Sequence, residues 1–234
     1  MDLEIKPNEG KSLTVEIDGE CYARIPVKTH VITNSDKLAD IFLDYVKPAA
    51  LPGDIIFISE KAVSCTQGRA IRMADIRPRR LAKFLCRFVL KTPYGIGLGI
   101  PETMEMALRE CGTVRILFAA FISAIGKLLG KRGWFYRIAG EKARAIDGPC
   151  DYTLPPYNEY VVLGPEDPKK AAQTAAEVCG CPVAVVDIND LGANILAVSD
   201  DCIGVEFMLK ALADNPLGQE SQQTPIGIVR AINN

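Results

Sequence analysis

The sequence predicts an α+β protein with mixed sheets flanked by helices. Short apolar runs of the kind found in strands alternate with stretches of helical spacing, and their order is mixed rather than regularly βαβ. The 234 residues are 48% hydrophobic, which is enough to build a packed core. Internal repeats and low-complexity stretches are missing from the sequence. We therefore expect one domain over residues 1–234, with an inserted helical segment at about 100–140.

The N-terminal part predicts a hairpin, a helix and a strand. Residues 13–25 alternate in polarity around Asp18-Gly19, a dipeptide typical of a tight hairpin turn. From Leu38 to Val46, apolar residues recur at helical spacing, so a helix should end before Pro48. A turn at residues 52–54 then leads into a strand at residues 55–59.

The middle of the chain predicts mainly helices. One should follow Pro78, and another should span residues 101–111, because proline is tolerated in a first helical turn. The uncharged run 116–126 is too short for a bilayer, which needs about 20 apolar residues. It predicts a buried helix or a subunit contact, with a helix at a membrane surface as the minor alternative. Residues 134–138 predict a short strand.

The C-terminal part alternates strands and helices. A strand at 160–163 should precede a helix that begins at Asp167-Pro168 and ends at Gly180. The continuous apolar run 182–186 is typical of a strand that is covered on both faces. A helix at 205–212 and a strand at 226–229 complete the order.

Charge and cysteine content exclude several classes of function. The formal net charge of −2 is too balanced for a nucleic-acid-binding protein. The eight cysteines and single histidine form no zinc-binding spacing, and a chain of this length needs no disulfide scaffold. The sequence begins without the basic and apolar segments of a signal peptide. We expect free thiols, a cytoplasmic location, and neither nucleic acid nor membrane as a partner.

Acidic residues lie in two loops at the ends of predicted strands and suggest a metal site. Asp147 and Asp151 lie in one segment, and Asp187 and Asp190 lie in another. Carboxylates from separate loops can bind Mg²⁺ and leave positions for phosphate oxygens. The alternative is that these residues form turns and cap helices, which are positions that aspartate favours.

Three further segments offer polar groups for an anionic ligand. Lys61, Ser64 and Arg69 follow the strand at 55–59, although no Walker A loop is present. The loop 217–224 is rich in amides that suit a base, ribose or phosphate, but solvated loops also have this composition. His30 is either a general base or a structural residue.

Six segments resemble, in order, the coenzyme F420-0:L-glutamate ligases, which use GTP to attach glutamate to a phospholactyl-flavin. They cover most of the chain from Ile25 onward. Their sequences are IPVKTHVIT, PGDIIFISEKAVSCTQGRAI, AIDGPCDYTLPP, VVLGPEDPKKAA, PVAVVDINDLG and NPLGQESQQTPIGIVR. The region from about Gly99 to Arg144 resembles no part of the simpler ligases.

The resemblance implies a set of binding residues but no catalytic residue. The metal ligands would be Asp151, Asp190 and Gln219, with Asp187 as a rival to Asp190. The implied nucleotide contacts come from three segments: Thr29, His30, Val31 and Ile32; Glu60, Lys61 and Cys65; and Leu217, Gly218, Gln219, Glu220, Ser221, Gln222, Gln223 and Thr224.

Four positions depart from the family pattern at this implied site. Cys65 replaces a phosphate-contacting lysine, and Leu154 replaces an asparagine that contacts nucleotide. Leu191 stands where a hydroxyl residue helps a second metal, and Gln219 replaces an acidic ligand. Each change removes a charge or a hydrogen-bonding group; Lys61 or Arg69 would have to compensate.

The resemblance implies an enzyme, a GTP- or ATP-dependent ligase that joins an acid to an amino acid. Mg²⁺ or Mn²⁺ would neutralise the nucleotide phosphates, a substrate carboxylate would form an acyl phosphate, and an amine would attack it. The substrates would be a small-molecule carboxylate and an amino acid, and the protein would be an intertwined homodimer. The alternative is a non-catalytic homologue that binds a nucleotide or anion and has lost the metal site.

Overall fold

The structure is a computed structural model that describes residues 5–89, 96–131, 133–150, 153–190, 192–218 and 222–232. The chain divides into two compact units. One domain over residues 1–234 with an inserted helical segment at about 100–140 stays a prediction. The first unit, here called the sheet unit, combines residues 1–68 with 165–234. The second, the helical unit, comprises residues 69–164 and contains the segment 100–140.

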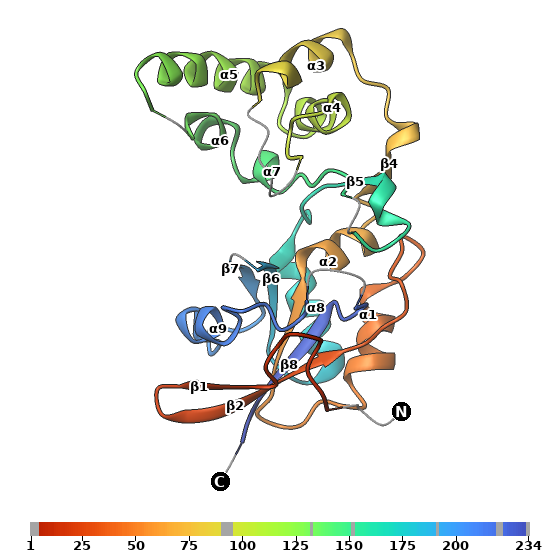
Figure 1. Cartoon of the computed structure of the whole chain (residues 1–234). Coiled ribbons are helices and arrows are strands. Elements are labelled where there is room, and N and C mark those ends of the chain that lie inside the picture. The colour runs from red at the N-terminus through yellow and green to blue at the C-terminus, as the bar shows by residue number, and fades with distance from the viewer. Residues whose placement is uncertain are drawn as a thin grey trace. The chain divides into compact units, whose positions relative to one another are not determined.

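The sheet unit is built on a six-stranded mixed sheet in the order β1-β2-β8-β3-β6-β7. Only β3 and β6 pair in parallel; the other neighbours are antiparallel. This confirms the predicted mixed α+β class. The strands are β1 (Thr14–Ile17), β2 (Glu20–Val27), β3 (Ile55–Ser59), β6 (Val183–Asn189), β7 (Gly192–Val198) and β8 (Ile226–Ala231) (Figure 1).

The predicted hairpin of the sheet unit and its three predicted helices are confirmed, and helix α2 is present without having been predicted. Asp18 and Gly19 connect β1 to β2 with positive φ angles of 54° and 89°, as a tight primed turn requires. The helices are α1 (Leu38–Ile41), which continues as a π-helical segment Phe42–Val46, and α2 (Glu60–Thr66), α8 (Pro168–Cys179) and α9 (Val205–Ala211).

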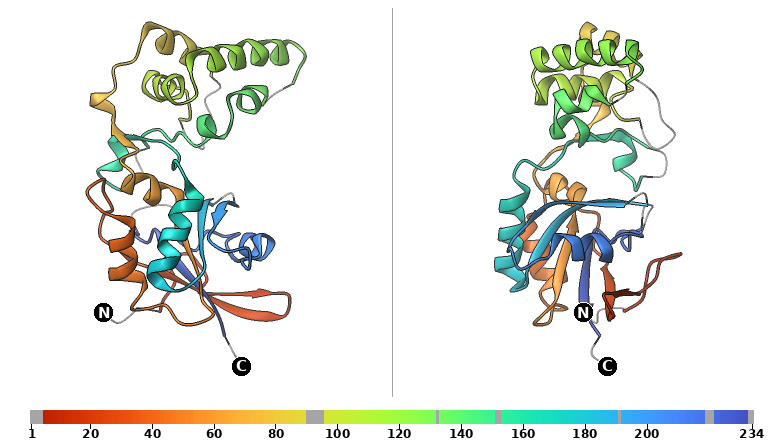
Figure 2. Two further views of the ribbon diagram at one scale, coloured as in Figure 1. Left: turned by 180° about the vertical axis from the view of Figure 1, so that it is seen from behind. Right: turned by 90° about the vertical axis from the view of Figure 1, so that its left-hand side faces the viewer.

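Helices cover both faces of the sheet, so its central strands are buried (Figure 2). Side chains of successive strand residues point to opposite faces. Phe57 and Val186 pack with Met208 of α9 on one face. Ile56, the neighbour of Phe57, is fully buried on the face that α1 and α8 cover. This alternation explains why β3 and β6 read as continuous apolar runs.

The helical unit packs short helices around one apolar core. A two-stranded antiparallel sheet of β4 (Ala70–Arg72) and β5 (Tyr160–Val162) joins its ends. Leu98, Met104, Leu108 and Ile116 are fully buried in the core. The helices are α3 (Arg80–Leu85), α4 (Pro101–Glu110), α5 (Thr113–Leu128), α6 (Trp134–Ala139) and α7 (Glu141–Arg144), with single 3₁₀ turns at 73–75, 86–88 and 157–159.

Two expectations for the helical unit are wrong. Residues 134–138 form helix α6, not a strand, because their aromatic and apolar side chains pack in the core at helical spacing. The run 116–126 is helical but is not a buried helix: only Ile116, Ala119 and Gly126 of α5 are buried. The expectation of a subunit contact there remains a prediction.

No single helix within the described residues is long and apolar enough to cross a membrane. Helices α4 and α5 reach that length and composition only as a pair, and the chain bends by 117° between them.

Candidate functional site

The sheet unit brings several predicted binding segments to one edge of its sheet. The register pairs Val27 of β2 and Ile58 of β3 with Ile226, the first residue of β8. Because β2 and β3 run antiparallel to β8, both end beside the point where β8 begins. Strand β6 runs parallel to β3, so it also ends on this side. Residues 29–32, helix α2, Asp190 and the loop before β8 therefore share one edge. This loop is described at residues 217–218 and 222–225.

A backbone hydrogen bond joins the first predicted segment to the last. The N–H group of Thr29 donates to the carbonyl of Gln223 at 3.0 Å. Thr29 is buried, and its hydroxyl donates to the carbonyl of His30 at 2.7 Å. Gln223 has a positive φ of 56°, so the loop turns sharply at this contact. These two segments lie 194 residues apart in the sequence and are in direct contact.

His30 is held by two neighbours, which favours its structural interpretation. Its Nε2 lies 3.0 Å from a carboxylate oxygen of Asp36, and its Nδ1 lies 2.9 Å from the hydroxyl of Tyr45. The pKa of Asp36 is lowered, mainly by a hydrogen bond from the Thr33 backbone N–H. Both ring nitrogens of His30 are thus engaged in the fold, and nothing about this geometry singles it out as a general base.

Helix α2 carries the second predicted segment directly from β3. The hydroxyl of Ser59 caps the helix by accepting from the N–H of Ala62 at 3.4 Å. Glu60 in the first helical turn is buried. Cys65, which stands where the family pattern has a phosphate-contacting lysine, is buried as well. Ser64 is fully buried, and its Oγ has no hydrogen-bond partner among the described residues. A buried side chain at position 64 does not serve as an exposed phosphate contact.

The loop before β8 is tied to the N-terminal segment by side-chain hydrogen bonds. The amide of Asn8 donates to the hydroxyl of Thr224 and to the carbonyl of Pro216, both at 2.9 Å. The Thr224 hydroxyl in turn donates to the Leu217 carbonyl at 2.7 Å. Val31, Gly218 and Gln222 are partly exposed, whereas Ile32 and Leu217 are buried. The loop therefore combines an anchored base with accessible polar positions.

Asp190 sits at the same edge, but a lysine ammonium already occupies one of its oxygens. Lys11 Nζ lies 2.8 Å from Asp190 Oδ1, and the Asn215 amide donates to that oxygen at 3.1 Å. The bond from Lys11 is the largest effect that lowers the pKa of Asp190. Asn215 also donates to the Gly218 carbonyl at 3.0 Å, so it links Asp190 to the loop before β8.

An ion pair anchors the turn that carries Asn215. Asp214 accepts from both terminal nitrogens of Arg24, whose side chain is only 2% exposed. The backbone carbonyl of Asp214 accepts from Lys11 at 2.8 Å. Burial acts to raise the pKa of Asp214, but hydrogen bonding and attraction from Arg24 outweigh it and leave the pKa lowered. The charged pair therefore persists at neutral pH and holds this turn in place.

The structure corrects the placement of two sequence candidates. Asp187 does not follow the strand in a loop: β6 continues to Asn189, and Asp187 pairs in register with Asn194 of β7. Arg69 belongs to the helical unit, where it contacts Glu110 at 2.6 Å and the Gly164 carbonyl at 2.5 Å. Arg69 is thus part of an internal network rather than a free phosphate-binding group.

Several predicted residues lie outside the described residues: Asp151, Leu191, Gln219, Glu220 and Ser221. Of the three predicted metal ligands, only Asp190 is described. In the part of the chain that the structure describes, no three His, Cys, Asp or Glu side chains are grouped to hold a metal ion. Leu154 lies in a turn, where its carbonyl accepts from the N–H of Tyr157 at 2.9 Å.

Four residues at this edge were not anticipated from the sequence: Asn8, Lys11, Arg24 and Asn215. Asn8, Lys11 and Arg24 each bond to a partner at least 179 residues away along the chain. Asn215 bonds to Asp190, which lies 25 residues away. An isolated Arg24 within an apolar strand was the one available hint, because buried arginines are usually paired.

The sequence was also compared with models of known protein families. The model of the family described as F420-0:gamma-glutamyl ligase matches residues 26–200. The matched range begins in β2 and ends just after β7, so it includes the segments 29–32 and 60–65 as well as Asp190. The curated proteins gave no match.

Proposed function

Because the chain belongs to the F420-0:gamma-glutamyl ligase family, we propose that it is a nucleotide-dependent ligase that joins a carboxylate to the amine of an amino acid. The observation that carries this proposal is the contact between residues 29–32 and the loop before β8 at one sheet edge, through the Thr29–Gln223 hydrogen bond. Segments that the resemblance implies as nucleotide contacts are neighbours in the fold.

The proposed reaction passes through an acyl phosphate. A carboxylate oxygen of the substrate bonds to the γ-phosphorus of GTP or ATP, and the nucleoside diphosphate leaves. The amine then bonds to the acyl carbon, and inorganic phosphate leaves as the amine loses a proton. In such transfers, positioning and stabilisation of charge supply most of the catalysis. The polar groups of the loop before β8 would hold and orient the nucleotide.

Mg²⁺ or Mn²⁺ would neutralise charge on the phosphates. The described residues do not by themselves make a complete metal site, since Asp190 is bonded to Lys11 and Asn215. We therefore assign no reaction step to the metal. Asp190 is the described candidate ligand, and Asp151 and Gln219 remain predictions from the sequence.

The first experiment is a thermal-shift and calorimetric screen of GTP, ATP and their diphosphates, each with and without Mg²⁺ or Mn²⁺. A ligand that binds only the native state raises its stability, by about 2.7 kcal/mol at a hundredfold excess over Kd. We expect stabilisation by a triphosphate that depends on the divalent metal. A positive result then justifies measuring phosphate release with mixtures of carboxylates and amino acids.

Matched aspartate variants test which residue supports metal binding. Asp190→Asn should abolish the metal-dependent part of the stabilisation, whereas Asp187→Asn should retain it. Asp151→Asn should also abolish it; unchanged binding by calorimetry in Asp151→Asn would contradict its assignment as a ligand. The reverse result at 187 and 190 would transfer the role to Asp187.

A second candidate function is a non-catalytic homologue that binds a nucleotide or anion without metal. The observation that favours it is the Lys11 ammonium: its Nζ lies 2.8 Å from Asp190 Oδ1, in the place that a metal ion bound to Asp190 would need. This alternative expects stabilisation by nucleotides regardless of metal, and no phosphate release. It also expects Lys11→Met to weaken nucleotide binding or leave it unchanged; under the ligase proposal, removing the ammonium exposes Asp190 and strengthens metal dependence.

A further inference from the structure

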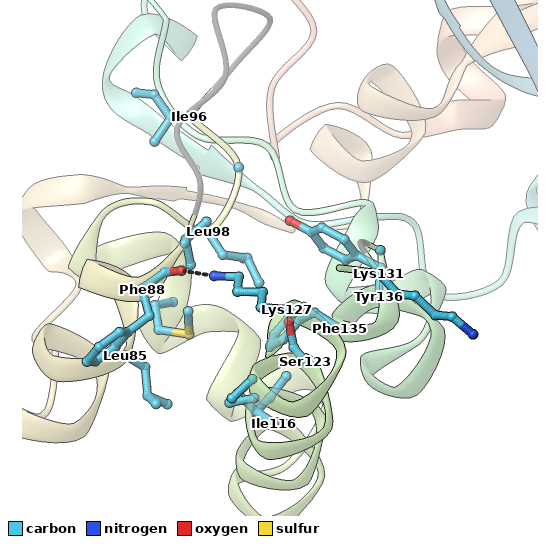
Figure 3. Close-up of a pocket in the computed structure, with 16 residues that line it drawn as sticks. Leu85, Phe88, Ile96, Leu98, Ile116, Ser123, Lys127, Lys131, Phe135 and Tyr136 are labelled. Carbon is cyan, nitrogen blue, oxygen red and sulfur yellow. Dashed lines mark hydrogen bonds between the residues drawn. The ribbon is translucent and has the colours of Figure 1, made fainter. Parts of the chain in front are cut away.

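The helical unit contains an apolar cavity that the proposed ligase chemistry does not use. Its volume is about 600 Å³, within the range of roughly 300–1,000 Å³ typical of small-molecule pockets. Helices α3, α4, α5 and α6 contribute to its wall, so it lies entirely within the helical unit (Figure 3).

The wall of the cavity is mostly hydrocarbon. Leu98, Met104 and Ile116 line its buried part, and Leu85, Phe88 and Phe135 line it from the flanking helices. The polar side chains among the lining residues are few: Ser123, Lys127, Lys131 and Tyr136. Burial raises the pKa of Tyr136, so its hydroxyl stays neutral at physiological pH. An apolar wall with few polar groups is typical of a site that binds an apolar body and orients one polar end.

The charged groups on this wall are all positive. Lys127 and Lys131 line the cavity, and no Asp or Glu is among the described residues that line it. Lys127 Nζ donates to the Phe88 carbonyl at 2.9 Å beside the cavity, whereas the Lys131 side chain points away from Lys127 (Figure 3). Lys131 Nζ lies 5.9 Å from the centre of the Trp134 ring. Among the described residues, neither ammonium forms an ion pair with a carboxylate. Lys127 is exposed, so its ammonium can meet a ligand head group at the rim.

Helix α5 supplies these features from one face. Ile116, Ala120, Ser123 and Lys127 follow one another at steps of four, three and four residues, which places them along one stripe of the helix. The stripe runs from a fully buried isoleucine to an exposed lysine, so polarity increases along it. Ala120 and Ser123 are small, which leaves room beside the stripe rather than filling it.

We propose that this cavity binds a long-chain carboxylate, with the hydrocarbon chain in the apolar interior and the carboxylate at Lys127. The chemistry of the ligand follows from the lining: an apolar body to match the wall and one negative charge to match the cationic rim. The hydrocarbon chain can belong to a free fatty acid or to an anionic membrane lipid, whose phosphate would take the place of the carboxylate, and the experiment separates these two sources.

The direct test uses cis-parinaric acid, a fluorescent long-chain fatty acid, with the full-length protein. We expect saturable binding of about one molecule per chain, and displacement by myristate, laurate and decanoate in decreasing order. Each methylene removed from a buried chain should weaken binding about fourfold. Displacement that does not depend on chain length would overturn the proposal, and this arm requires no variant.

Two matched variants on α5 locate the site. Ala120→Phe fills the cavity and should weaken probe binding at least about tenfold, whereas Val114→Phe adds the same ring at a position that is 81% exposed and outside the cavity. Val114→Phe should bind as the wild type does. Equal binding by the two variants, both shown to be folded by circular dichroism, would contradict the assignment.

The cationic rim is tested by charge reversal. Lys127→Glu should weaken myristate binding about tenfold, while displacement by the neutral myristyl alcohol should change little, because a charged hydrogen bond is lost only for the acid. Lys83→Glu changes the same charge in the same unit at a position that does not line the cavity. An equal effect of both substitutions would show that the loss of binding comes from the overall charge of the unit. That result would refute the proposed contact at the cavity rim.

Vesicle sedimentation identifies the source of the chain. Phosphatidylcholine vesicles containing phosphatidylglycerol are mixed with the wild type and with Ala120→Phe. Capture of the wild type but not of Ala120→Phe would assign the ligand to a membrane lipid, and capture of neither would leave the free acid as the ligand. Equal capture of both, with no binding of cis-parinaric acid, would overturn the cavity site in favour of the exposed face of α5.

Discussion

Replacing Asp214 by asparagine should destabilise the sheet unit and loosen the candidate site. Arg24 is almost fully buried, and Asp214 is its only carboxylate partner among the described residues. Removing one member of a buried ion pair typically costs about 3–5 kcal/mol. Two features place the expected cost for this pair at the lower end of that range. The Asp214 side chain is 48% exposed, and Arg24 keeps the carbonyls of Ala211 and Ser12 as acceptors at 3.1 and 2.8 Å. We expect a loss of about 3 kcal/mol.

Urea denaturation at neutral pH measures this loss directly, and Asp18→Asn is its matched control. Asp18 forms an ion pair with Lys210, but both side chains are exposed, at 76% and 44%. Such pairs contribute about 0–1 kcal/mol. Similar losses for the two variants would refute the reasoning, because burial of Arg24 is the feature that separates them.

Acid should reduce the difference between the wild type and Asp214→Asn. The pKa of Asp214 is lowered in the folded protein, so its charged form is stabilised by folding. That contribution is complete above the unfolded value of about 3.9 and is lost as the pH falls through the lower folded value. The unfolding free energies of the wild type and Asp214→Asn should therefore converge at pH values below about 4. A stability difference that stays constant with pH would indicate that the charge of Asp214 is not the cause.

Two further substitutions test the packing of each unit. Glu105→Gln should cost about 2 kcal/mol of unfolding free energy, since the buried carboxylate accepts from Arg79 and Arg109 at 2.9–3.1 Å. The pKa of Glu105 is lowered because those hydrogen bonds outweigh burial. Thermal melts should therefore show this loss at pH 7 and less of it in acid. Gly227→Ala should cost about 1–3 kcal/mol in urea denaturation, because the new Cβ would lie 2.3 Å from the Phe57 ring; an unchanged midpoint would show that the ring moves freely.

Local patterns determined most of the secondary structure. The Asp18-Gly19 turn, the proline at the start of α4 and the glycine after α8 specify their elements through backbone conformations that depend on neighbouring residues alone. Where local preference was ambiguous, the prediction failed. Residues 134–138 combine aromatic and apolar side chains that suit a strand or a helix, and packing in the helical unit selected the helix.

Tertiary pairing decided elements that the sequence specifies only weakly. Strand β7 begins with Gly192-Ala193-Asn194, a composition that is unfavourable in strands, and it forms because β6 provides a partner. The same pairing extends β6 through Asp187 and leaves Asp190 at its end. One strand pairing therefore places Asp187 within a strand and Asp190 after its end, and which of the two binds a metal stays a prediction.

The sequence by itself determined the family resemblance and the residue types of the candidate site, because both depend on the order of residues along the chain. Only the tertiary structure decided which residues meet: the Thr29–Gln223 contact and the Lys11–Asp190 pair join segments nearly two hundred residues apart. Such contacts arise from strand order and register, which depend on burial across the whole sheet. The cavity beside α5 has the same origin, since its walls come from four helices whose individual sequences indicate only amphipathic packing.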